Sequence, residues 1–265
     1  MSIPKIIHYC WFGRGELPAL AKKCIASWER FFPGWEIREW NEDNFDVNAI
    51  AYTREAYAAK KYAFVSDYAR FKILYEQGGV YFDTDVEVLR PMDEILERGA
   101  FMGLERNVPA ENSVNPGLGL ACAPGLGLYK DILNAYHELH FELSPGVYNF
   151  KTVVQYTSEI LLRRGLKPKP GIMEIDGVFI YPTEYFSPKS WETGEIRLTA
   201  NTYTIHHFAA SWHSRRERIY YWTKRRFGAR AALALSLAFI LFRNPKKNWN
   251  ALVRRIGGNK RGGGV

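Results

Sequence analysis

Two aspartates separated by one residue, Asp83 and Asp85, are the side chains of this 265-residue sequence best suited to do chemistry. A strand through both would point the two carboxylates to the same side, with the backbones about 6–7 Å apart. Oxygens at that spacing can share one hard cation, whereas without a cation the two charges repel. The pair is therefore either a polar strand end, with Asp85 capping a turn, or part of a functional site.

Two functional interpretations fit the Asp-x-Asp pattern. Residues 80–86 match the nucleophile motif of a haloacid-dehalogenase-type phosphatase, in which Asp83 would be the nucleophile and Asp85 the acid and base. That chemistry needs further carboxylates downstream to complete its Mg²⁺ site. The aspartates that follow stand singly, at Asp93, Asp131 and Asp176, which counts against a phosphatase. The other interpretation is the metal site of a glycosyltransferase that uses a nucleotide sugar.

The residues before the pair predict the elements that position it. An apolar stripe at helical spacing predicts a helix, and its members are Phe64, Tyr68, Phe71 and Tyr75. Asp67 and Arg70 lie three residues apart on a neighbouring face, so their side chains share one side of that helix. Gly78 and Gly79 predict its end, because glycine enters a left-handed turn freely. Residues 80–82 then begin a strand that delivers the aspartates.

Upstream of this helix, strand and helix patterns alternate. Strands are predicted at 5–11 and 35–40, and amphipathic helices at 17–32 and 47–60. This order predicts an α/β fold with helices packed on a sheet, in which ligands bind beyond the carboxyl ends of the strands. Trp11 and the aspartate pair both lie at such ends.

Composition and charge divide the chain into two parts. From His213 to the end there are 14 Lys and Arg residues and one acidic residue, which leaves 22 basic and 27 acidic residues in the rest. The body is therefore mildly acidic, unlike most nucleic-acid enzymes, and we expect no nucleic-acid partner. The cysteines are odd in number and lack metal-ligand spacing, so Cys10, Cys24 and Cys122 are expected to be core thiols.

The basic segment also holds an apolar run at 231–242, between Arg230 and Arg243. A spanning helix needs about 20 apolar residues, so the run favours an interfacial helix, with a terminal helix packed on the core as the alternative. We expect a catalytic domain at 1–213 and a basic, partly apolar helical tail at 214–265 that associates with a membrane. The start of the chain shows no secretory signal, so the expected location is cytoplasmic, peripheral on the membrane.

Four segments in order resemble the glycosyltransferases with an Asp-x-Asp sugar-binding region. They are Ile3–His8 with Trp11, Ser66-Asp67-x-x-Arg70, Gly78-Gly79-Val80-Tyr81-x-Asp83-x-Asp85, and His206-His207 followed by Ser211-Trp212. This family includes the yeast α-1,6-mannosyltransferase type and bacterial capsule and lipopolysaccharide glycosyltransferases. The resemblance covers residues 3–212. It implies a GT-A-type, Rossmann-like mixed sheet flanked by helices, Mn²⁺ or Mg²⁺, a UDP- or GDP-sugar donor and transfer with retention.

The resemblance also implies roles for single residues around the donor. Asp85 would ligate the metal, and Asp83 would bind the metal or the donor ribose and sugar. Asp67 and Arg70 would hold the donor sugar. Two aromatic residues would contact the donor as well: Tyr81 would line its pocket, and Trp11 would stack on the base.

The last segment would complete the metal site. His207 is the expected third protein ligand, and His206 is the alternative. Neighbours on a strand face opposite ways, so one of the two histidines would reach the metal. Ser211 and Trp212 would contact the diphosphate or close over it. On the acceptor side, Asn115 and Gln155 are candidate contacts.

Together these features predict a metal-dependent retaining hexosyltransferase, with Asp83, Asp85 and Arg70 as its catalytic residues. Its acceptor would be a growing surface polysaccharide or a lipid-linked glycan. Two alternatives remain at this point: the phosphatase, and a carbohydrate-binding module that has kept the fold and lost catalysis.

Overall fold

The computed structural model describes residues 2–108, 111–167, 169–191 and 193–209, together with the single positions 219, 220, 223, 228 and 235. The chain divides into two compact units, Met1–Trp191 with Glu195–Ala209, and Glu192–Gly194 with Ala210–Val265. The predicted domain boundary after residue 213 and the helical tail lie outside the described residues, apart from those single positions, and stay predictions.

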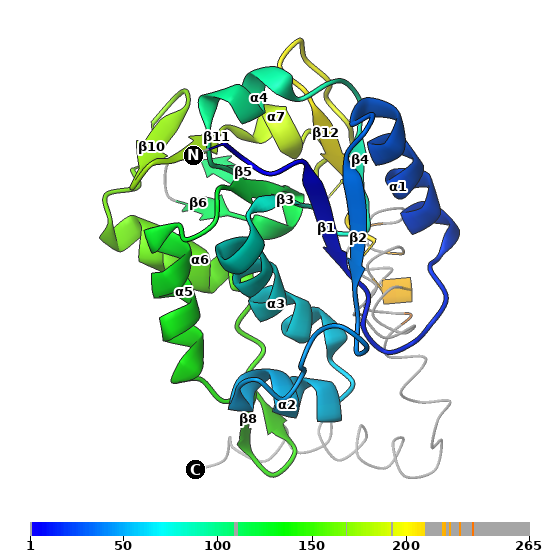
Figure 1. Cartoon of the computed structure of the whole chain (residues 1–265), viewed down its shortest axis with the longest axis vertical. Coiled ribbons are helices and arrows are strands. Elements are labelled where there is room, and N and C mark those ends of the chain that lie inside the picture. Colours follow the sequence, from blue (N-terminus) through cyan, green and yellow to red (C-terminus); the bar gives the residue numbers. More distant parts are fainter. Residues whose placement is uncertain are drawn as a thin grey trace, which may run out of the picture. The chain divides into compact units, whose positions relative to one another are not determined.

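A mixed sheet forms the centre of the first unit, with strands in the order β10-β11-β5-β7-β3-β1-β2 and β6 paired to β5 (Figure 1). The strands are β1 Ile6–Cys10, β2 Glu36–Trp40, β3 Gly79–Tyr81, β5 Phe101–Val108, β6 Glu111–Val114, β7 Leu120–Cys122, β10 Met173–Ile175 and β11 Val178–Tyr181. β1 pairs in parallel with both β2 and β3, whereas β3 and β7 are antiparallel. The predicted α/β class, with a mixed sheet flanked by helices, is confirmed.

Two smaller strand pairs lie outside this sheet. β4 Val86–Val88 pairs antiparallel with β12 Thr204–His206, and β8 Glu142–Ser144 forms a hairpin with β9 Val147–Tyr148. The helices are α1 Ala19–Phe31, α2 Ala51–Ala58, α3 Tyr62–Gln77, α4 Asp93–Arg98, α5 Gly127–His137, α6 Val153–Arg163 and α7 Thr183–Phe186, with a 3₁₀ turn, η1, at Pro116–Leu118. No helix among the described residues is long and apolar enough to cross a membrane.

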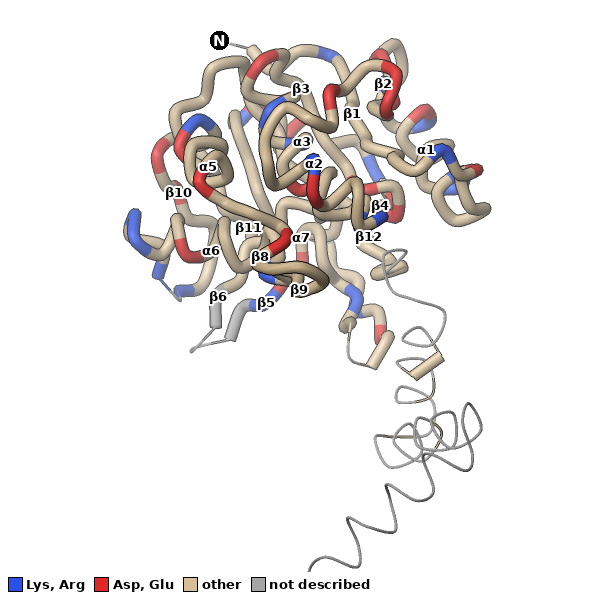
Figure 2. The backbone as a smooth tube through the Cα atoms, turned by 90° about the horizontal axis from the view of Figure 1, so that it is seen from below, with Lys and Arg blue, Asp and Glu red and all other residues tan. Residues whose placement is uncertain are grey.

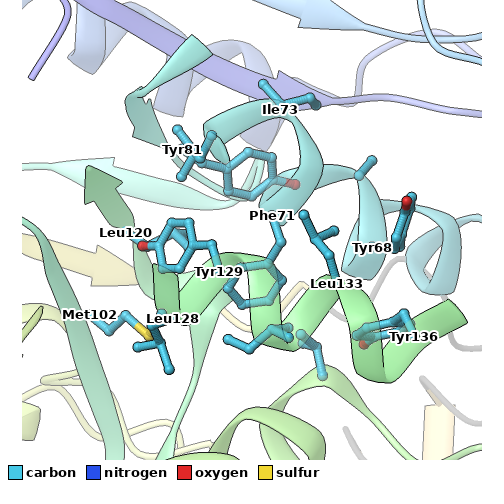
Figure 3. Packing of buried hydrophobic residues seen from close by; sticks show 14 of the residues in the cluster. Tyr68, Phe71, Ile73, Tyr81, Met102, Leu120, Leu128, Tyr129, Leu133 and Tyr136 are labelled. Atoms are coloured by element: carbon cyan, nitrogen blue, oxygen red, sulfur yellow. The ribbon is translucent and has the colours of Figure 1, made fainter. Parts of the chain in front are cut away.

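Both faces of the sheet are buried, because neighbouring strand residues contribute to different apolar clusters. Val80 packs in one cluster with Trp28 of α1, whereas Tyr81 packs in the other with residues of α3 and α5. In the second cluster, Phe71 of α3 meets Tyr129 of α5 edge to face, at 5.1 Å between ring centroids (Figure 3). Such burial on two sides is typical of the central strands of α/β proteins.

Helix α3 forms where its apolar stripe predicted it, and Phe64, Tyr68 and Phe71 are buried. It ends at Gly78, whose φ is 67°, followed by Gly79 at 98°. A Cβ at Gly79 would lie 2.6 Å from the carbonyl oxygen of Ile6, so glycine is also required there for β3 to pair closely with β1. The predicted double-glycine stop is therefore confirmed.

Candidate functional site

The chain delivers Asp83 and Asp85 by a turn, which corrects the expectation that one strand carries both. β3 ends at Tyr81, and the backbone N–H of Val86 donates to the carbonyl oxygen of Asp83 at 3.0 Å. β4 then begins at Val86 and belongs to the other sheet, with β12. The two aspartates therefore lie in the link between two sheets, beyond the carboxyl end of β3, where ligands are expected in such folds.

Asp83, Asp85 and His206 come together in a cluster whose potential ligand atoms all lie within 4.8 Å of one another. The antiparallel register pairs His206 with Val86, which places its imidazole next to Asp85. The Nε2 atom of His206 lies 3.1 Å from Oδ1 of Asp85. The backbone N–H of Ala209 also donates to the Asp85 carboxylate, at 2.7 Å, so the 206–209 segment is fixed to this aspartate twice.

The structure reverses the preference between the two histidines. The backbone N–H of His207 donates to the carbonyl oxygen of Asp85, but its Nε2 atom lies 2.7 Å from the carboxylate of Glu87. Neighbouring residues of an extended segment point to opposite sides. Because His206 takes the side of the aspartates, His207 is directed away from them, and His206 is the candidate third ligand.

Arg70 connects helix α3 to the cluster. One terminal nitrogen of its guanidinium lies 3.1 Å from Oδ1 of Asp67 and 3.1 Å from Oδ1 of Asp83. Its Nε atom donates to the backbone oxygen of Ser66 at 3.2 Å, and the residue is only 3% exposed. The predicted Asp67–Arg70 pair on one helix face therefore exists, and it holds the first aspartate of the motif in place.

Asp67 and Tyr81 are both buried. The second carboxylate oxygen of Asp67 accepts the backbone N–H of Val153 at 3.3 Å. The hydroxyl of Tyr81 donates to Oδ1 of Asp83 at 3.0 Å, while its ring lies in the core. Tyr81 therefore orients Asp83 in place of lining a pocket with its ring, and direct contact of Asp67 or Arg70 with a donor sugar stays a prediction.

Burial affects the carboxylates of the site unequally. Burial and the charge of Asp85 raise the pKa of Asp83, and the nearby guanidinium of Arg70 only partly opposes this. Burial also acts to raise the pKa of Asp85, but the charge of His206 and the hydrogen bonds outweigh it and lower that pKa to about 2. Burial raises the pKa of Asp67 to about 6. Asp85 is thus the carboxylate held most firmly in its charged form.

Gly117 of η1 forms a wall of the site that the sequence alone did not indicate. Its carbonyl oxygen accepts the backbone N–H of Asp83 at 3.3 Å, and an added Cβ would overlap the Asp83 carboxylate. Asn115 accepts the N–H of Gly117 at 2.7 Å and donates to Glu105 at 3.1 Å. This close approach arises from folding of distant segments, so no local motif marks Gly117.

The remaining predicted site residues fall into two groups. Trp11 lies at the carboxyl end of β1, is partly exposed, and donates its indole N–H to the backbone oxygen of Gly15 at 2.6 Å. Gln155 contributes to the capping box at the start of α6 with Thr152, which gives it a structural partner. Ser211 and Trp212 lie outside the described residues.

Residues 18–102 match the family model described as the glycosyltransferase sugar-binding region containing a DXD motif. The matched range includes Asp67, Arg70, Asp83 and Asp85, the residues joined by the contacts above. The family model thus matches the part of the chain that holds the aspartate pair and the Asp67–Arg70 pair, and the resemblance predicted from the motifs is confirmed.

Among curated proteins, the chain is similar to inositol phosphoceramide mannosyltransferase 1 of Schizosaccharomyces pombe (strain 972 / ATCC 24843). The two are 30% identical over 112 residues, which cover 38% of this chain. The match spans only about a third, 34%, of the length of that relative. The similarity is thus regional, and it does not extend over either protein as a whole.

Three solved glycosyltransferase structures are also similar to this chain. The PaToxG glycosyltransferase has a TM-score of 0.43 at 16% identity, covering 61% of this chain and 69% of its own. A glycosyltransferase involved in glycosylation of the major capsid of PBCV-1 has 0.46 at 13%, covering 81% and 97%. The galactosyltransferase LgtC, in complex with donor and acceptor sugar analogs, has 0.41 at 14%, covering 86% and 95%. At these values the likeness carries no statement about function.

Proposed function

We propose that this chain is a metal-dependent retaining glycosyltransferase that moves a hexose from a nucleotide-sugar donor to a growing surface polysaccharide or a lipid-linked glycan. The observation that carries the proposal is the cluster of Asp83, Asp85 and His206, whose potential ligand atoms lie within 4.8 Å of one another. Two of the three belong to the matched sugar-binding region. The substrate classes and retention are proposed from the family resemblance.

The residues of the cluster fit a divalent cation. Carboxylate oxygens with one imidazole suit Mn²⁺ or Mg²⁺. The Nδ1 atom of His206 is buried and has no hydrogen-bond partner among the described residues, so this ring is not fully satisfied by protein contacts. When bound, the cation would stabilise the charge that builds up on a diphosphate leaving group.

The surrounding side chains would prepare the cluster for this task. Arg70 and Tyr81 both contact Oδ1 of Asp83, which fixes the direction of that carboxylate. His206 and the N–H of Ala209 keep Asp85 charged. We assign no covalent nucleophile and no base; for retention, the leaving phosphate would guide the acceptor hydroxyl to the same face of the sugar.

A donor screen tests the proposal. We expect one UDP- or GDP-sugar to raise the melting temperature of the full chain in the presence of Mn²⁺, and the same donor to be hydrolysed slowly to free nucleotide. Carbohydrate binding without hydrolysis or transfer of any donor would support the binding module. Turnover of p-nitrophenyl phosphate that depends on Asp83 would support the phosphatase.

We also propose that the basic segment 214–265 binds anionic lipid, so that the protein is peripheral on the cytoplasmic face of a membrane, near a lipid-linked acceptor. The support is the excess of basic residues and the apolar run at 231–242. Flotation with liposomes would compare the full chain with a chain ending at His213. Equal binding by the two would contradict a role for the segment.

A further inference from the structure

Exposed apolar side chains gather on the β8–β9 hairpin and the residue that follows it closely, Phe150. Leu143 is 63% exposed, Val147 52% and Phe150 54%. Among the described residues, six large apolar side chains are exposed, and three of them lie within residues 143–150. The others are Leu162, Ile196 and Leu198. Grouped exposed apolar residues mark an interaction surface, whereas single ones need no explanation.

The hairpin is built to hold these side chains outward. At its base, Phe141 is fully buried and stacks on Tyr148, at 5.4 Å between ring centroids. The carboxylate of Glu55 accepts the backbone N–H groups of Phe141 and Glu142 at 2.9 and 3.0 Å. The hairpin is thereby fixed to helix α2, beside which it lies (Figure 2). The hairpin is thus an anchored element, and it exposes Leu143 and Val147 to solvent.

Two lysines lie beside Phe150, at the base of the hairpin. The ammonium of Lys61 lies 5.5 Å from the centre of the Phe150 ring, and Lys60 is exposed next to it. No carboxylate of the described residues forms an ion pair with either lysine. On the hairpin itself, the exposed carboxylate of Glu142 accepts the N–H of Gly146 and keeps its negative charge, so Lys60, Lys61 and Glu142 together leave an excess of one positive charge. Apolar side chains edged by free ammonium groups suit the interface of an anionic bilayer, which accepts both.

The surface also lies close to the candidate site. The Phe150 ring lies 6.0 Å from that of Phe64, one turn of α3 before Asp67. Three residues after Phe150, the N–H of Val153 donates to Asp67. A bilayer on the hairpin would therefore be near Asp67, which lies in the range that the family model matches.

We propose that the β8–β9 hairpin, with Phe150, Lys60 and Lys61, docks on an anionic lipid bilayer and inserts Leu143, Val147 and Phe150 into its interface. These residues are not part of the basic segment 214–265. Docking requires no donor sugar, so its failure and the failure of the proposed enzyme activity are distinguishable.

A dye on the hairpin tests the proposal in the full chain. The three native cysteines are free and buried, so a Val147→Cys variant can be labelled selectively with an environment-sensitive fluorophore. Leu198→Cys is the matched control, because Leu198 is 59% exposed outside the hairpin. With vesicles of phosphatidylcholine and phosphatidylglycerol, we expect a blue shift and a several-fold rise in emission at position 147 but not at 198.

Two results would overturn the proposal. One is an unchanged emission spectrum of the dye at position 147 when the protein floats with the vesicles, since the protein would then bind lipid through another surface. The other is a shift without vesicles that grows with protein concentration, which would indicate a second copy of the chain on the hairpin.

A second measurement uses substitutions alone. The Leu143→Ser, Val147→Ser, Phe150→Ser triple variant should bind the same vesicles at least about tenfold more weakly, whereas Ile196→Ser with Leu198→Ser should bind as the native chain does. Lys60→Gln with Lys61→Gln should reduce the preference for vesicles that contain phosphatidylglycerol over phosphatidylcholine alone. Unchanged binding by the triple variant, with an unchanged circular dichroism spectrum, would contradict the proposal.

Discussion

The Nε2 atom of His206 lies 3.1 Å from Oδ1 of Asp85, although His206 is the last residue of β12 and Asp85 lies in the turn before β4, far from it in the sequence. The contact closes a three-residue cluster with Asp83. It makes the site depend on the pairing of β4 with β12, so substitutions in either strand can be used to test the assignment.

Asp85→Asn should lower the rate of transfer at least about 100-fold, because the amide keeps the shape of the side chain but removes the charge that a cation needs. The measurements are steady-state kinetics and Mn²⁺ titration. Asp93→Asn, at an exposed position in α4, is the matched control and should leave both unchanged. Full activity of Asp85→Asn would show that the metal assignment is wrong.

His206→Ala and His207→Ala should separate the two histidines. His206→Ala removes an imidazole beside Asp83 and Asp85, so we expect Mn²⁺ affinity to fall at least about tenfold, as followed by electron paramagnetic resonance. His207→Ala loses only the contact with Glu87 and should retain most of the affinity. A larger loss for His207→Ala would contradict the placement described above.

Gly117→Ala should reduce activity while the protein stays folded. The added methyl would overlap the Asp83 carboxylate and the 3₁₀ turn would have to shift. Gly127→Ala is the control, since a Cβ there meets nothing within 4 Å at the start of helix α5. Kinetics and thermal unfolding of both variants check this, and a fully active Gly117→Ala protein would refute the close approach.

His8 should lower the stability of the protein as the pH is lowered toward 4, whereas Asp67, whose pKa burial raises to about 6, acts in the opposite direction. Burial lowers the pKa of His8 from 6.5 to about 4, although its hydrogen bond to the oxygen of Gly78 partly opposes this. Between these values the imidazole binds a proton in the unfolded chain and not in the folded one, so His8 lowers the free energy of unfolding, by about 2 kcal/mol at about pH 5.

Urea unfolding at about pH 7 and about pH 5 measures this decrease. The change in the free energy of unfolding from about pH 7 to about pH 5 should be more favourable in His8→Gln than in the native chain, even if the variant is less stable at both. His137→Gln, at an exposed position, should keep the native difference. An identical pH dependence in His8→Gln and the native chain would exclude His8 as the source.

Local patterns predicted the elements that depend on near neighbours. The stripe of Phe64, Tyr68 and Phe71 and the stop at Gly78 define α3 correctly, because helix periodicity and glycine conformation are properties of short segments. The same helix places Asp67 and Arg70 on one side, as expected from their spacing.

Strand pairing between distant segments determines the features of the site that local sequence patterns did not predict. A single strand through Asp83 and Asp85 was expected, but Val86 pairs with His206 in a second sheet and the backbone turns between the aspartates. The choice between His206 and His207 depends on the register of that pairing, and a shift of one residue would exchange their faces. The approach of Gly117 to Asp83 is likewise set by tertiary folding.

One path of polar contacts runs from the first turn of α6 to the aspartate pair. The N–H of Val153 binds Asp67, Asp67 binds Arg70, and Arg70 binds Asp83. This path gives the two ends a route by which to influence each other. By linkage, any effect of a ligand at Asp83 on the affinity of that turn for a partner is matched by an equal effect of the partner on the affinity for the ligand. If lipid binding by the hairpin changes the affinity for the donor by some factor, the donor must change the affinity for lipid by the same factor.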